Sequence, residues 1–147
     1  MKKFYKYLLN GIKYFAMQSI GETIFIIILM YFGLPYSGML VGGEPLWEVI
    51  IGILGYHAFF KLLIYGWVYL PLFVGINFYK GFHSELQFSI VNAVLSLLLP
   101  VLILFLRHLS IHEMENIFIA TFITSGLIIL FARNYDNKRS ETTVLNL

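Results

Sequence analysis

The chain has 147 residues, of which 59% are hydrophobic and only 12% are charged, and its formal net charge is +2. Soluble domains carry about 25% charged residues, so this apolar excess predicts a membrane protein whose solvent is lipid. The small net charge gives no indication of nucleic-acid binding, and the absence of cysteine excludes disulfides, thiolate metal sites and cysteine nucleophiles.

The first segment, residues 1–13, is basic and has helical periodicity. Phe4, Leu8 and Ile12 fall on one side of a helix, whereas Lys6 and Lys13 fall on another. This pattern predicts one of two arrangements. The segment is either an interfacial amphipathic helix held against anionic headgroups or a cytoplasmic extension of the span that follows.

Four apolar stretches come next, and each predicts a transmembrane helix, because a helical span needs about 20 mostly apolar residues. The expected spans are residues 14–33, 49–73, 87–106 and 116–132. Together they predict an all-α integral membrane domain, residues 14–133, with its four helices in an up-down bundle. Residues 134–147 are polar and aperiodic, so we expect a flexible cytoplasmic tail there.

The distribution of basic residues predicts the orientation of this bundle. With four spans, the lysines and arginines of the N-terminal arm, the second loop and the tail share one side, and the opposite loops hold only Arg107. The positive-inside rule then places both termini in the cytoplasm. The small size and the Lys-, Ile-, Phe- and Tyr-rich composition favour a multi-pass protein of a bacterial inner membrane.

Two charged residues interrupt the first two spans. Glu22 lies roughly 12 Å beyond the cytoplasmic start of its span, and Lys61 lies roughly 13 Å before the cytoplasmic end of the next, at 1.5 Å per residue. Consecutive spans are usually antiparallel neighbours, so the two side chains are expected to meet at matching depth. An ionised side chain at that depth is costly unless it is paired, which makes an ion pair the most economical interpretation.

Polar residues on all four spans are expected to surround this pair. They are Gln18, Ser19, His57, Tyr65, Asn92, Ser96, Thr124 and Ser125. Pro100 cannot donate to the carbonyl of Ser96, so we also expect a kink in the third span. Two interpretations remain open at this point. The layer is either a structural lock between helices or a route for an ion, a proton or a substrate along Glu22, Lys61 and His57.

Small residues on the second span suggest a packing surface. Gly52, Gly55 and Gly66 fall on a side roughly opposite Lys61 and would allow close helix approach. That surface packs either within the protomer or against a second copy of the chain, and the pattern does not decide between them.

Candidate enzymatic sites are few. His108 and His112 are four residues apart and could share a helical face toward a metal, but they do not form an HExxH arrangement, and solvated loop residues are the simpler interpretation. With no catalytic motif in the chain, we predict neither an enzyme nor a cofactor.

The layout of four short spans with a glutamate in the first is similar to that of the small multidrug-resistance transporters. This chain differs in its greater length and in its second buried charge, so the resemblance implies only a general transport hypothesis. The leading prediction is a subunit of a membrane complex, partnered by the lipid bilayer and by itself or another membrane protein. The alternatives are a small oligomeric transporter or channel and a membrane-embedded sensor that signals to a soluble partner.

Overall fold

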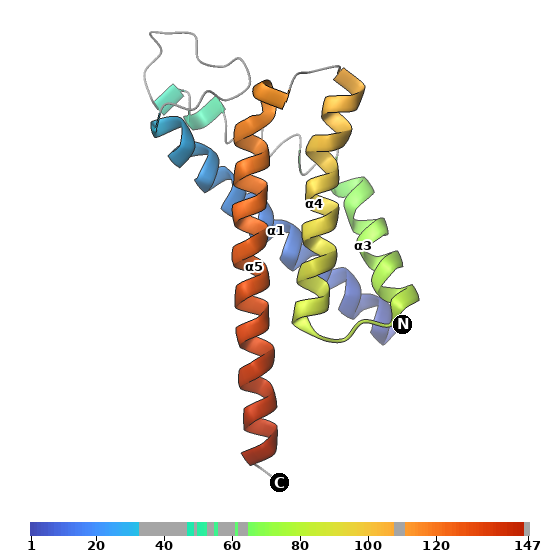
Figure 1. The fold of residues 1–147 in the computed structure, drawn as a ribbon. Helices are drawn as coiled ribbons and strands as arrows, with labels where there is room; N and C mark the ends of the chain where they lie inside the picture. The colour runs from blue at the N-terminus through green and yellow to red at the C-terminus, as the bar shows by residue number, and fades with distance from the viewer. Residues whose placement is uncertain are drawn as a thin grey trace.

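A computed structural model of the chain describes residues 1–32, 47–48, 50–52, 55, 61, 65–107 and 111–145; within these, the side chains of 99, 102–104, 106–107, 111–115 and 141–145 are not described. The described residues form helices and short connections without a strand (Figure 1). The prediction of an all-α protein is confirmed for this part of the chain.

The described helices are α1 (Lys2–Tyr31), α3 (Gly66–Lys80), α4 (Glu85–Arg107) and α5 (Ile111–Leu145). In Figure 1, α4 and α5 stand side by side with opposite chain directions, and α1 crosses them obliquely. Helix α3 packs against α1 and α4. Both chain ends lie at the lower end of the view, where α5 extends well beyond the other helices.

The turn between α3 and α4 is encoded locally. Gly81 ends α3 in a left-handed conformation, with φ of 65°, which a residue without a Cβ adopts without strain. Ser84 then begins α4 with a reciprocal capping box: its hydroxyl oxygen accepts from the Gln87 backbone N–H over 3.1 Å, and the Gln87 side-chain oxygen accepts from the Ser84 N–H over 3.1 Å. This tight connection makes α3 and α4 antiparallel neighbours.

Aromatic side chains form the core where α1, α3 and α4 meet. The rings of Tyr69 and Phe73 stack with centroids 5.6 Å apart, and Phe73 contacts Phe88 of α4 at 6.3 Å. All three residues are fully buried. Gly11 lets α1 approach this cluster, because a Cβ at that position would lie 3.1 Å from the Phe73 ring.

Two helical stretches among the described residues are long and apolar enough to cross a membrane: Lys2–Tyr31 and Asn116–Ser140. A shorter apolar stretch covers Glu85–Leu98. Large apolar side chains point outward from both long stretches, including Ile20, Ile24 and Phe122. These features are compatible with a membrane protein.

The helix boundaries differ from the expected ones at both ends of the chain. Helix α1 is continuous from Lys2 to Tyr31, so the basic segment and the first expected span form one helix. Helix α5 continues to Leu145, through most of the segment 134–147 that we expected to be a flexible tail. On this polar part, Asp136 accepts hydrogen bonds from the backbone N–H groups of Glu85 and Leu86 at the start of α4.

The middle of the chain also differs from expectation. Helix α3 begins at Gly66 and ends at Lys80, seven residues beyond the expected end of the second span at residue 73. Most of residues 49–65 lie outside the described part of the chain. Pro100 is buried inside α4, which runs from Glu85 to Arg107 as one helix.

Candidate functional site: a buried polar network

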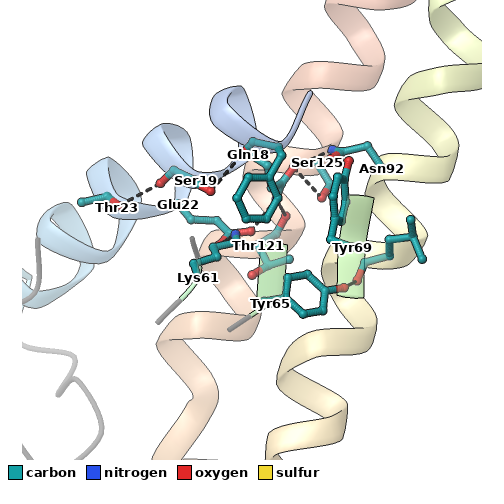
Figure 2. Close-up of polar contacts among 12 residues, drawn as sticks. Gln18, Ser19, Glu22, Thr23, Lys61, Tyr65, Tyr69, Asn92, Thr121 and Ser125 are labelled. Atoms are coloured by element: carbon teal, nitrogen blue, oxygen red, sulfur yellow. Dashed lines mark hydrogen bonds and ion pairs between the residues drawn. The ribbon is translucent and has the colours of Figure 1, made fainter. Parts of the chain in front are cut away.

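The centre of the candidate site is an ion pair between α1 and the segment that precedes α3. The ammonium of Lys61 donates to Oε2 of Glu22, and each side chain is only 3% exposed (Figure 2). Taking two charges out of water costs free energy, so the stability of the pair depends on further hydrogen bonds to the carboxylate oxygens of Glu22.

Gln18, four residues before Glu22 on α1, supplies one of these bonds. Its Nε2 donates to Glu22 Oε1 over 2.7 Å and to the backbone carbonyl of Thr121 over 3.2 Å. Its Oε1 accepts from Asn92 Nδ2 over 3.0 Å and from the Ser125 hydroxyl over 3.3 Å. A glutamine amide can donate two hydrogen bonds and accept two, so all four positions of Gln18 are used. One side chain of α1 thereby binds both α4 and α5.

The hydrogen bonds extend to α3 and share one direction. The Tyr69 hydroxyl donates to Asn92 Oδ1 over 2.7 Å, Asn92 donates to Gln18, and Gln18 donates to Glu22. Lys61 donates to the same carboxylate from the other side. Aligned hydrogen bonds polarise one another, so the series stabilises the negative charge of Glu22. We call Lys61, Glu22, Gln18, Asn92, Tyr69 and Ser125 the polar network.

Two amides limit what the polar network can do chemically. Gln18 and Asn92 stand between Tyr69 and Glu22, and an amide nitrogen donates without accepting. A proton passing through either residue would require an unfavourable tautomer of the amide. The series therefore transmits polarisation and holds helices together better than it carries protons.

Two other polar residues of the expected layer, Ser19 and Tyr65, bond to backbone carbonyls outside the polar network. Ser19 donates to the carbonyl of Phe15 over 2.8 Å, within its own helix. The Tyr65 hydroxyl donates to the carbonyl of Leu95 and so links the residue that precedes α3 to α4. Ser96 is buried on α4.

Thr124, another member of the expected layer, has no such bond. It is buried on α5, and its hydroxyl oxygen has no hydrogen-bond partner among the residues that the structure describes. It faces Gly21, where an added Cβ would lie 2.5 Å from the Thr124 methyl carbon. This is the closest helix contact at any glycine in the described residues, and no sequence pattern distinguishes Gly21 from the other glycines.

The predicted glycine surface is not brought together as one packed face. Gly66 is buried, and a Cβ there would lie 3.7 Å from the ring of Phe15. Gly52 and Gly55 are exposed, and a Cβ built at either has no contact within 4 Å among the described residues. Within that part of the chain, only Gly66 of the three packs against another segment.

The predicted histidine positions are outside the described side chains. His57 and His108 lie outside the described residues. His112 lies on the helical backbone of α5, but its side chain is not described. In the described part of the chain, no three His, Cys, Asp or Glu residues are grouped as metal ligands would be.

A second polar cluster, not predicted from the sequence, lies at the end of the protein where the termini are. Its members are Lys13, Tyr14, Glu85 and Asp136, which we call the helix-end cluster. Lys13 donates to Glu85 Oε2 over 2.8 Å, and the Tyr14 hydroxyl lies 2.7 Å from the same oxygen. Asp136 of α5 accepts from the backbone N–H groups of Glu85 and Leu86 over 3.3 and 2.9 Å.

The helix-end cluster perturbs the Glu85 carboxyl group. Partial burial acts to raise the pKa of Glu85, but the hydrogen bonds from Lys13 and Tyr14 and the charge of Lys13 outweigh it, so the pKa lies below its ordinary value of 4.5. Asp136 places a carboxylate at the N-terminus of α4, where the helix dipole favours negative charge. The only sequence signal for this site was the Ser-x-x-Gln capping box at residues 84–87.

Comparison of the chain with protein-family models, with curated proteins and with solved structures gives no match.

Proposed function

We propose that this chain is a four-span membrane protein, with both termini in the cytoplasm of a bacterial cell, and that it acts as a non-enzymatic subunit of a membrane complex. The observation that carries this proposal is the saturation of Gln18, which uses every hydrogen-bonding position on contacts with three other residues of the protomer and with Glu22. A polar interior bonded to itself supports a structural role more than the binding of a substrate.

Topology supports the membrane placement. The apolar stretches of α1 and α5 are long enough to cross, and the two chain ends lie at one end of the protein (Figure 1). Lys2, Lys3 and Arg133 are exposed near that end, as the positive-inside rule requires for a cytoplasmic side.

The extension of α5 supports a role in assembly. Asp136 fixes α5 to the start of α4, and the helix continues for nine further residues to Leu145. A helix of that kind, standing clear of the other helices, offers a surface to another subunit on the cytoplasmic side. Arg133 and Tyr135 are exposed at its base.

The test is to purify the full-length chain from its native membranes in mild detergent and to measure the mass of the intact complex. We expect a stoichiometric second subunit, either another protein or another copy. A chain that ends at Asn137 should lose that subunit while its melting temperature stays within a few degrees of the full-length value. A full-length chain that is strictly monomeric and has no stoichiometric partner would refute the proposal.

A transporter or channel is the second candidate, because opposite charges buried on different segments are frequent in ion and substrate routes. The measurement is solute or proton flux into proteoliposomes. Flux that is lost in Glu22→Gln while the protein remains assembled would favour this candidate over the first.

A further inference from the structure

The first turns of α1 have three distinct sides. Tyr7 and Gly11, four residues apart, face the protein: the Tyr7 ring contacts Phe78 edge-on at 6.3 Å, and Gly11 lies against Phe73. The remaining two sides of this segment are exposed, and they differ in chemistry.

One exposed side is apolar. Tyr5, Leu9 and Ile12 follow the i, i+4, i+7 spacing of a single helix face and are 59%, 65% and 48% exposed. The other exposed side is basic, with Lys2, Lys6 and Lys13 at helical spacing. A buried side flanked by an apolar side and a basic side is the pattern of a helix that lies in a membrane interface.

The length and direction of α1 are compatible with its first turns lying in a membrane interface. Its 30 residues would span about 45 Å, whereas the hydrocarbon core of a bilayer is about 30 Å thick. Figure 1 shows α1 oblique to α4 and α5. An oblique helix leaves the hydrocarbon at a shallow angle, so its first turns remain among the headgroups instead of projecting into water.

Of the three lysines on the basic side, only Lys13 forms an ion pair with α4, through Glu85. Lys6 is exposed, and its ammonium lies 5.9 Å from the centre of the Phe88 ring. Lys2 and Lys3 are exposed at the end of the helix. This part of the surface is complementary to the phosphates of anionic lipids.

We propose that residues 2–13 of α1 form a docking surface for anionic phospholipid headgroups. Tyr5, Leu9 and Ile12 enter the boundary of the acyl chains, and Lys2, Lys3 and Lys6 bind the lipid phosphates. This inference depends on the membrane placement proposed above and not on the existence of a partner subunit.

The depth of the helix provides the first test. Because the chain has no cysteine, single spin labels can be placed at Leu9→Cys and Asn10→Cys in nanodiscs that contain phosphatidylglycerol. We expect the Leu9 label to collide more with oxygen and the Asn10 label more with a water-soluble nickel chelate. Equal exposure of both labels to nickel would overturn the inference. A label at Ile24→Cys separates the two proposals, because exposure of that site to nickel would contradict the membrane placement itself.

Lipid selectivity provides the second test. We expect the preference for phosphatidylglycerol over phosphatidylcholine to fall about fivefold for each lysine removed in the variant Lys2→Gln, Lys3→Gln, Lys6→Gln. The matched variant with arginine at all three positions should keep the preference, and added salt should weaken it. An unchanged preference in the glutamine variant would overturn the inference.

Discussion

Gly21 of α1 and Thr124 of α5 are so close that a Cβ built on Gly21 would lie 2.5 Å from the Thr124 methyl carbon. Contacts that short do not occur between real side chains, so an alanine at Gly21 would have to displace α1 or Thr124. The contact also adjoins the ion pair, since Glu22 is the next residue of α1.

We therefore predict that Gly21→Ala destabilises the protein by about 1–3 kcal/mol through overpacking. The measurement is thermal or denaturant unfolding in detergent, with circular dichroism as the probe of the transition. Gly75→Ala is the control, because a Cβ at that position has no neighbour within 4 Å. Adding Thr124→Ser, which removes the methyl group, should recover part of the loss. Equal stability of the Gly21 and Gly75 variants would contradict the prediction.

The buried ion pair predicts a strong coupling between two substitutions. Glu22→Gln and Lys61→Met alone should each lower the free energy of unfolding by about 3–5 kcal/mol. The first variant leaves the buried ammonium of Lys61 without its counter-charge, and the second does the same to the carboxylate of Glu22. The double variant should be more stable than the sum of the single effects predicts. A double-mutant cycle of unfolding free energies measures this coupling, and additive losses would be evidence against a structural pair.

Gln18 offers a test of hydrogen-bond direction. Gln18→Glu removes the two donors and places a carboxylate beside that of Glu22, so it should destabilise the protein more than Gln18→Leu does. The leucine variant still leaves the amide of Asn92 without its acceptor, which costs about 1–3 kcal/mol. The comparison is made by unfolding both variants at neutral pH. A more stable glutamate variant would show that the direction of the series is wrong.

The helix-end cluster predicts an acid-dependent loss of stability. Because the folded-state pKa of Glu85 is lowered from 4.5, its contribution is complete above that value and is lost as the pH falls through the lower folded-state pKa. The half-exposed Lys13 limits the effect to about 1 kcal/mol. The melting temperatures of wild type and Glu85→Gln should therefore differ at pH 7 and converge in acid. A constant difference down to the lowest pH would rule out Glu85 as its source.

Part of the polar network could be predicted from the sequence. The proximity of Glu22 and Lys61 follows from matching depths on consecutive antiparallel spans, and the helical spacing of Gln18 and Asn92 directs both toward the same layer. These arguments need only the rise per residue of a helix and the cost of charge in lipid.

The other features of the site and of the fold depend on side-chain contacts that the periodicity of the sequence cannot predict. Tyrosine is common at membrane boundaries, so its residue type alone does not assign Tyr69 to a buried layer. Its buried hydroxyl, bonded to Asn92, places it in the polar network. Helix α5 continues past residue 133, and there Asp136 bonds to the start of α4, a contact with a different helix that local polarity cannot indicate. Likewise, Gly21 differs from other glycines only through its neighbour on α5.

The four bonds of Gln18 have a consequence for biosynthesis. Glu22 is translated before Lys61, and Gln18 before the residues of α4 and α5 that complete its amide contacts. Helix α1 therefore carries an acid that is made before the lysine that pairs with it, and of its bonded partners named above only Gln18, on the same helix, is already present. Helix α1 can complete these contacts only after Ser125 of α5 has been made, so we expect nascent chains that stop before Ser125 to be cleaved by proteases faster than longer ones.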